Sequence, residues 1–295
     1  MPRPSRLKLA KADIAAFFAA QPPRAYSKTE LAAIFHATRR DWNLARSTTP
    51  PDFIAFLVKQ GILQTWDFRS KAYANQGVER FVFGEVSPLA LAISLKSRGY
   101  LCHGTAMALH GIGKANSKEL YLNVEQSAKP SRASALSQVS IKQAFSRKQR
   151  RSNLVLTSRG VSVIIVSGKN TGDLGVEETK GSFSEALRVT SLARTLIDIV
   201  VRPAYAGGAR EVLKAYQAAK GKVSPEELAS LLKRIDYVYP YHQAIGFLME
   251  YAGYAADAYE RFRARKLKHD FYLAHGMLSP KYSKDWRLYY PADFK

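Results

Sequence analysis

Three helical patterns followed by two strand patterns open the chain, and this succession restricts the fold more than any other feature of the sequence. Residues 9–20 space their apolar side chains as a helix does, until QPPRA ends the pattern. Ser27 and Glu30 form a capping box ahead of an apolar run, which predicts a second helix. Pro50 and Pro51 suit the first turn of a third helix.

The third helical pattern is followed by two short apolar segments, ILQTWDF and RFVFG, which flank a polar loop and predict a β-hairpin. Three helices and a hairpin within residues 1–85 are typical of a winged helix-turn-helix DNA-binding domain. Ser87 and Pro88 then begin a new helix, and helix and strand patterns continue to the C-terminus. We therefore predict an α+β protein, with a winged helix-turn-helix over residues 1–85 and a larger mixed α/β domain over residues 86–295.

The charge of the chain favours a polyanionic partner. Lysine and arginine number 45 against 24 acidic residues, a formal net charge of +21. Cations placed along phosphates release condensed counterions, so nucleic acid is the first candidate. An anionic membrane surface, or a basic protein that needs only solubility, is the alternative. Residues 129–170 contain no acidic residue, which predicts a second phosphate-contacting surface or a patch that faces an acidic protein.

Arginine is the side chain best shaped for bidentate contact with guanine or phosphate. Arg39, Arg40 and Arg46 lie just ahead of, or within, the predicted recognition element, and Arg69 and Lys71 lie in the predicted wing. The alternative is that these are solvated surface residues. The residues expected to contact DNA are Lys28, Arg39, Arg40, Arg46, Arg69, Lys71, Arg147, Lys148, Arg150 and Arg151.

The common catalytic motifs are absent from the sequence, which has no P-loop, no H-E-x-x-H, no G-x-S-x-G and no G-x-G-x-x-G after a strand. Glu178 and Lys180 have the E-x-K spacing of some metal-dependent nucleases, with Asp173 five residues upstream. That site normally lies on core strands, whereas NTGDLGVEETKGS is polar and glycine-rich and is expected to be a loop. We therefore predict no catalytic residue, metal or cofactor, and keep a metal-dependent nuclease as an alternative.

Cysteine and histidine meet in the segment YLCHGTAMALHGIG, which the sequence predicts to be a helix. His103 and His110 would then lie about 10 Å apart along the axis, too far to share one metal ion. Cys102 and His103 would point about 100° apart, so the histidine would be poorly placed to activate the thiol. The expectation is a packing role, with Cys102, Ala106 and Leu109 on one apolar stripe.

The cellular compartment follows from two further observations. A single cysteine cannot form an intrachain disulfide, which fits a reducing compartment. No apolar run approaches the roughly 20 residues that span a bilayer, and Lys8, Lys11 and Asp13 stand where a signal peptide would be apolar. We expect a cytoplasmic protein without a membrane partner.

Two blocks of sequence resemble a known family. The run H-G-T-A-x-x-L-H-G-I (His103–Ile112), between a winged helix and the strand LYLNV, is similar to the AbiEi antitoxins of bacterial type IV toxin-antitoxin systems. The later run TSLARTLIDIV (Thr190–Val200) looks like that family's second recurrent block, and order and spacing agree over residues 9–200. The segment after the second helix is longer and richer in arginine than the family pattern, which leaves the start of the recognition helix open.

The resemblance implies a transcriptional repressor and antitoxin without enzymatic activity. Such a protein binds inverted repeats in the operator of its own operon and counters a cognate nucleotidyltransferase toxin. We expect a monomer in solution that binds double-stranded DNA cooperatively. A basic protein-interaction module is the remaining alternative.

Overall fold

The computed structural model describes residues 4–73, 75–114, 116, 118–128, 136–183 and 185–294. The chain forms a mixed α+β protein that divides into two compact units. The N-terminal unit comprises Met1–Gly99, Leu154–Val163 and Glu178–Leu187, and the C-terminal unit comprises Tyr100–Asn153, Ile164–Glu177 and Arg188–Lys295. This division differs from a single boundary after residue 85, because the N-terminal unit includes two later segments of the chain.

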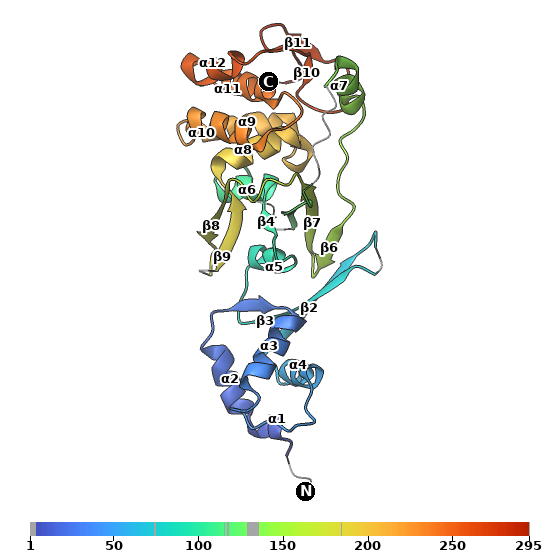
Figure 1. Cartoon of the computed structure of the whole chain (residues 1–295), viewed down its shortest axis with the longest axis vertical. Helices are drawn as coiled ribbons and strands as arrows, with labels where there is room; N and C mark the ends of the chain where they lie inside the picture. The colour runs from blue at the N-terminus through green and yellow to red at the C-terminus, as the bar shows by residue number, and fades with distance from the viewer. Residues whose placement is uncertain are drawn as a thin grey trace. The chain divides into compact units, whose positions relative to one another are not determined.

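The N-terminal unit begins with the helices and the hairpin that its sequence pattern indicates, together with a short first helix and a short strand that the pattern did not indicate. They are α1 (Arg6–Leu9), α2 (Lys11–Ala19), β1 (Arg24–Tyr26), α3 (Lys28–Thr38), α4 (Pro50–Lys59), β2 (Gln64–Ser70), β3 (Gly77–Phe83) and α5 (Pro88–Ser94) (Figure 1). The capping box of Ser27 and Glu30 opens α3, as predicted. Thr49 and Asp52 form a second capping box that fixes the start of α4 at Pro50. Strand β3 pairs antiparallel with both β1 and β2.

Aromatic side chains fill the core of these first helices. Phe35 and Phe53, from α3 and α4, are fully buried with ring centroids 5.6 Å apart. Trp42, from the turn between the two helices, stacks on Phe53 at 5.7 Å. Fully burying one such side chain contributes roughly 1.5–3 kcal/mol, so this cluster ties the turn to both helices.

The remaining elements follow α5 along the chain. The helices are α6 (His103–Leu109), α7 (Gln138–Phe145), α8 (Leu192–Val201), the 3₁₀ turn η1 (Pro203–Tyr205), α9 (Ala209–Ala219), α10 (Pro225–Ile235), α11 (Tyr241–Tyr251) and α12 (Ala256–Arg263). The strands are β4 (Tyr100–Leu101), β5 (Glu119–Glu125), β6 (Val155–Ser158), β7 (Val161–Gly168), β8 (Val176–Lys180), β9 (Ala186–Thr190), β10 (Phe271–Tyr272), β11 (Lys281–Ser283) and β12 (Leu288–Tyr290).

Within the described residues, nine strands form one mixed sheet in the order β1-β3-β2-β6-β7-β5-β4-β9-β8. Strand β4 pairs antiparallel with β5 and parallel with β9. Strands β10, β12 and β11 form a separate small sheet. The turn between β6 and β7 has Arg159 at φ 45° and Gly160 at φ 82°, the left-handed pair that a tight hairpin requires.

Helix α8 packs against α6, α9, α10 and α11 in the C-terminal unit, and Figure 1 shows α9 and α10 beside it. Every residue from Ala193 to Val200 is buried. Two of them are charged: the Arg194 Nε lies 2.8 Å from the Asp198 Oδ1, with exposed side-chain fractions of 3% and 8%. Burial raises the pKa of the Asp198 carboxyl, and the Arg194 guanidinium opposes that rise. The two residues, four apart on one helix, therefore form a buried structural ion pair.

Two sequence-based predictions of local structure are wrong. The segment around YLCHGTAMALHGIG is strand β4 followed by α6, so Cys102 precedes the helix in extended conformation, and Leu109 is 37% exposed rather than packed on Cys102. Residues 176–180 form strand β8, not a loop. The prediction failed because β8 is a polar strand at the edge of the sheet and has no apolar pattern. Helices α1 and α12 and strands β1, β9 and β11 were not predicted. Among the described helices, none is long and apolar enough to cross a membrane.

Replacement of one residue of the buried ion pair should lower the stability of the protein far more than replacement of one residue of an exposed ion pair. We expect Asp198→Asn to lower the free energy of unfolding by about 3–5 kcal/mol, because it leaves the Arg194 charge buried without a carboxylate. The control is Asp293→Asn, whose partner Arg210 and own side chain are more than half exposed, and which should cost less than about 1 kcal/mol. Urea denaturation followed by circular dichroism measures both, and equal losses would contradict the prediction.

Candidate functional site

The basic segment after α7 lines a large cavity of the C-terminal unit. Arg147, Lys148, Arg150 and Arg151 all border this cavity, whose volume is about 1110 Å³. Lys169 joins them just after β7, and Arg202 joins them from the end of α8. Among the described residues that border it, none carries a carboxylate. The C-terminal cations that the sequence predicted to contact phosphate therefore lie together, and we call this feature the cationic cavity.

The backbone of the segment is held in place on both sides. The Gln149 Oε1 accepts a hydrogen bond from the Ala204 amide at 3.0 Å, and the Ser152 amide donates to the Tyr205 hydroxyl at 2.6 Å. The Gly276 amide donates to the Phe145 carbonyl at 2.8 Å. Gly276 has φ +61°, and a Cβ there would lie 3.2 Å from the Lys148 amide nitrogen, so a glycine is needed for this close approach. The cations thus extend from a fixed main chain.

The cations of the cavity divide into two groups by their contacts. The first group consists of cations that already have a partner in the protein. The Lys169 Nζ donates to the Ile235 carbonyl at 2.7 Å, and the Arg202 Nη2 donates to the Ser167 carbonyl at 3.0 Å. The Arg151 Nη2 lies 3.2 Å from the Glu119 Oε1.

The second group is Arg147, Lys148 and Arg150. All three are exposed and border the cavity. None of them makes a side-chain hydrogen bond or ion pair with another described residue. Three cations are therefore held in position and three are available to an anion.

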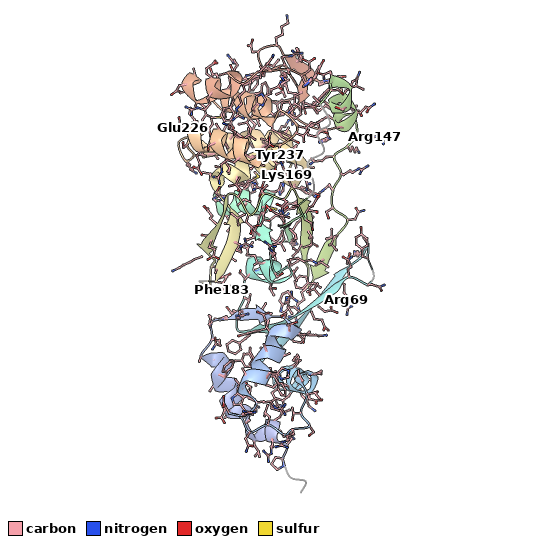
Figure 2. The ribbon with its side chains drawn as sticks, viewed as in Figure 1. Arg69, Arg147, Lys169, Phe183, Glu226 and Tyr237 are labelled. Atoms are coloured by element: carbon pink, nitrogen blue, oxygen red, sulfur yellow. The ribbon has the colours of Figure 1, made fainter. Side chains whose placement is uncertain are left out.

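Aromatic side chains form the other wall of the cavity. Tyr237, Tyr239 and Tyr241, at alternate positions before and at the start of α11, border it together with Tyr205. The Lys169 Nζ lies 5.7 Å from the centroid of the Tyr237 ring, and Figure 2 shows these two residues side by side. Burial raises the pKa of Tyr237 and of Tyr241, so both remain neutral phenols.

Another aromatic residue comes from the segment after β10. The His275 ring is stacked on the Phe145 ring with centroids 4.2 Å apart, and it also borders the cavity. Burial lowers the pKa of His275, which favours the neutral imidazole.

A smaller cavity of about 90 Å³ adjoins the cationic cavity, since the two share Lys169, Val201, Arg202 and Tyr237. Its remaining lining residues are polar and buried: His103, Asn123, Arg194 and Asp198. The cationic cavity therefore ends at a hydrogen-bonding floor.

The relation between Cys102 and His103 corrects the sequence-based expectation. His103 has φ 48° and its Nδ1 lies 3.0 Å from the Cys102 Sγ, because Cys102 is extended rather than helical. The two side chains are thus in contact, although neighbours on a helix would point apart. Burial raises the pKa of the Cys102 thiol and lowers that of His103 to about 3, so the contact joins two neutral groups.

The N-terminal residues predicted to contact DNA differ in their contacts. The Arg39 Nη2 donates to the carbonyls of Ala45 and Arg46 at 3.2 and 3.3 Å, and so braces the turn between α3 and α4. Lys28 forms an ion pair with Glu79, and Arg69 forms one with Asp67 at 2.7 Å.

The other three predicted residues are exposed: Arg40 and Arg46 in the turn, and Lys71 after β2. In the described part of the chain, no ion pair involves them. These three residues keep their charge available to a ligand.

Three further sets of charged residues do not belong to either group of predicted DNA contacts. Lys129 and Arg132 lie outside the described residues. Arg159 belongs to the N-terminal unit, where its guanidinium lies 4.5 Å from the Trp66 ring centroid. Asp173 is 2.6 Å from the Arg188 Nη2, and no group of three His, Cys, Asp or Glu side chains suited to a metal occurs among the residues that the structure describes.

Sequence reasoning missed part of the cavity wall. The missed residues are distant in sequence from the basic segment, by 50 to 130 residues. They are Arg202, His275 and the tyrosines of DYVYPYH. A run of three tyrosines at alternate positions was the signal that could have drawn attention to this wall.

Comparison with known proteins finds likeness at the level of fold. No family model matches the chain, and no curated protein sequence matches it. A crystal structure of the RV2827C protein from Mycobacterium tuberculosis is similar, with a TM-score of 0.55 and 14% sequence identity over 96% of this chain and 91% of that chain. At this identity the match supports the α+β fold and says nothing about ligands.

Acid should destabilise the protein partly through His103. Because its folded pKa, about 3, lies below the ordinary value of 6.5, its contribution to stability is present above pH 6.5 and is lost as the pH falls toward 3. We expect His103→Asn to make the slope of unfolding free energy against pH shallower in this window, by up to about 1.4 kcal/mol per pH unit. Asparagine tolerates the left-handed backbone at this position.

The control is Thr105→Val in the same helix, which removes the hydrogen bond from the Tyr121 amide to the Thr105 hydroxyl without removing a titrating group. This variant should lose stability but keep the wild-type slope. Urea titrations at pH 7, 6, 5 and 4 provide the comparison. Identical slopes for His103→Asn and the wild type would show that His103 takes up no proton on unfolding.

Proposed function

We propose that this protein is a cytoplasmic DNA-binding autorepressor and antitoxin without catalytic activity. The observation that carries the proposal is the order of elements in the N-terminal unit: α2, β1, α3, α4, then the hairpin β2–β3, with the sheet order β1-β3-β2. We interpret this order as a winged helix-turn-helix, with α3 and α4 as its two helices and the β2–β3 hairpin as its wing. The net charge of +21 supports a nucleic-acid ligand.

The DNA contacts of this unit are assigned to the turn rather than to α4. Helix α4 reads PPDFIAFLVK and has a single cation, Lys59, so it offers little for reading base edges with charged side chains. Arg40 and Arg46 lie in the turn ahead of it, exposed, and Arg39 braces that turn through its carbonyl contacts. We infer that Arg40 and Arg46 contact phosphates or bases, and that Arg39 acts by holding the turn.

Operator recognition would follow from two copies on an inverted repeat. A protein that is a monomer in solution places one helix-turn-helix in each half-site, and the half-sites lie about one helical turn, 34–36 Å, apart or at multiples of it. Cooperative binding then comes from the DNA, which brings the two copies together.

The antitoxin role is proposed for the C-terminal unit. Both sequence blocks that resemble the AbiEi family lie there, as α6 and α8. The blocks are joined by a hydrogen bond between the His110 Nε2 and the Thr190 carbonyl at 2.7 Å. This contact supports the idea that the blocks form one packed unit, and we propose that this unit counters a cognate nucleotidyltransferase toxin.

Charge removal in the turn tests the repressor role. In gel shifts at about 150 mM salt, the wild type should prefer its own upstream region to random duplex. The double variant Arg40→Gln, Arg46→Gln should bind at least tenfold more weakly, and its plot of log affinity against log salt should be shallower by about 2, or roughly 0.9 per lost phosphate contact.

The matched control for this experiment is Lys220→Gln, Lys222→Gln, which removes two exposed charges after α9 in the C-terminal unit. It should leave both affinity and salt slope within twofold of the wild type, on the scale of ordinary surface changes. An absent preference for the upstream region, or an equal loss from both double variants, would remove the basis of the proposal.

Co-expression tests the antitoxin role separately. The proposed nucleotidyltransferase toxin, expressed from an unrelated promoter, should arrest growth, and this protein should restore it. The unrelated promoter removes any effect of repression. Continued arrest with the full-length protein present would contradict the antitoxin role and leave the repressor role untouched.

A further inference from the structure

We propose that the cationic cavity is a binding site for a phosphorylated nucleotide, taken either as a free mononucleotide or as the unpaired 5′-phosphorylated end of a strand. The site is distinct from duplex recognition by the N-terminal unit. Four features of the site support the proposal: the size of the cavity, the arrangement of its charges, its aromatic wall and its polar floor.

The size of the cavity suits a single nucleotide better than a duplex. Its 1110 Å³ is close to the upper end of the roughly 300–1,000 Å³ that small-molecule sites occupy, and an equal sphere is about 13 Å across. Duplex DNA, whose major groove alone is about 12 Å wide, presents a convex surface too broad to enter. An exposed patch along a groove would suit a duplex, whereas a hollow of this diameter suits a single nucleotide unit.

The charges of the cavity suit phosphate. Arg147, Lys148 and Arg150 extend from one short segment and have no described side-chain partner, so their attraction for an anion is not offset by a carboxylate. The anchors at Gln149 and Ser152 fix the main chain between and beside them. A ligand therefore meets a surface whose backbone is already ordered, which lowers the entropy cost of binding.

The aromatic wall suits a base. Tyr237, Tyr239 and His275 are partly exposed rings that border the same cavity as the cations. Stacking of a nucleobase on an aromatic side chain contributes roughly 1–3 kcal/mol and needs no particular base. A simple polyanion such as a phosphopeptide would use the cations but would gain little from these rings, and on that ground we favour a nucleotide.

The polar floor gives the site a means of discrimination. Asn123 donates from its Nδ2 to the Tyr100 hydroxyl at 2.7 Å, and His103 is held neutral beside it in the small adjoining cavity. Lys169 and Arg202 border both cavities and therefore lie between the open cavity and this floor. The Asn123 amide and the neutral His103 ring, which line this cavity beside the Arg194–Asp198 ion pair, suit a sugar hydroxyl or a base edge.

Isothermal titration calorimetry at 100 mM salt tests the site with four probes. They are ATP, inorganic tripolyphosphate, a 5′-phosphorylated ten-residue oligodeoxythymidylate and the same oligonucleotide with a 5′-hydroxyl. We expect ATP to bind at least about fivefold more tightly than tripolyphosphate, or the 5′-phosphorylated strand to bind at least about fivefold more tightly than its 5′-hydroxyl form, since stacking and a charged phosphate contact are each worth more than 1 kcal/mol. The first result identifies a free nucleotide as the ligand, and the second identifies a strand end.

Variants of the full-length protein locate the site. Arg147→Gln, Lys148→Gln should weaken the tighter probe by about tenfold or more, because two charge-assisted contacts are lost. Both residues are exposed and make no described side-chain contact, so the variant should fold, and thermal unfolding confirms this. The matched control Lys220→Gln, Lys222→Gln should change the affinity less than about twofold.

Three results would overturn the proposal: no measurable binding of ATP or of the 5′-phosphorylated strand, equal binding of ATP and tripolyphosphate together with equal binding of the two strands, or equal weakening by the two double variants. Duplex binding is measured by gel shift and nucleotide binding by calorimetry, so either proposal can fail while the other holds.

Discussion

The buried ion pair of Arg194 and Asp198 is the interaction on which the C-terminal unit depends. Removing two charges from water costs several kcal/mol each, and the pair is tolerated because the guanidinium also donates to the Leu174 carbonyl and contacts the Thr171 hydroxyl at 3.2 Å. Glu125 holds the loop that contains Thr171 and Leu174 from the other side, since its carboxylate accepts hydrogen bonds from the amides of Thr171 and Gly172. Helix α8, the loop and strand β5 are therefore fixed to one another. Lys169 lies two residues before this loop, and its place in the cationic cavity follows from the same contacts.

The excess positive charge of the chain is distributed over separate structures. The basic run that the sequence shows as one stretch is divided between the two units: Arg147 to Arg151 border the cavity, whereas Arg159 lies over Trp66 in the N-terminal unit. Some of its cations are neutralised or occupied, as Arg151 is by Glu119. Among the residues predicted to contact DNA, those without a described ion pair lie in the turn before α4, after β2 and in the segment after α7. A polyanion would be attracted to each of these places.

Local signals predicted most of the helices, and long-range contacts explain what the sequence did not show. Caps and prolines give reliable starts, and Ser27, Ser87, Ser191 and Ser224 each accept the hydrogen bond that opens a helix. Strand β8 was missed because an edge strand with exposed glutamates has no apolar alternation. The contact of Cys102 with His103 depends on a positive φ that no local pattern reveals.

The candidate site was predictable only in part. Its four adjacent cations were visible as a cluster in the sequence, since charge density needs no fold to be counted. Its aromatic wall depends on the packing of α7 against the segment around Phe271 and on the start of α11, which brings Tyr239 to Phe145. Such a wall has no signature within any one segment. In the N-terminal unit, the sequence could not distinguish Arg39, which serves the turn, from Arg40, which faces solvent.

The burial of Cys102 has a consequence for how the protein opens. The thiol is fully covered, neutral and hydrogen-bonded toward the Tyr121 carbonyl at 3.6 Å, and the chain contains no other cysteine. A thiol reagent reaches it only when the β4–α6 junction separates from β5, so the rate of labelling measures the opening of the C-terminal core without any engineered probe. The residue that first suggests chemistry in this sequence thus serves as an internal reporter of local unfolding.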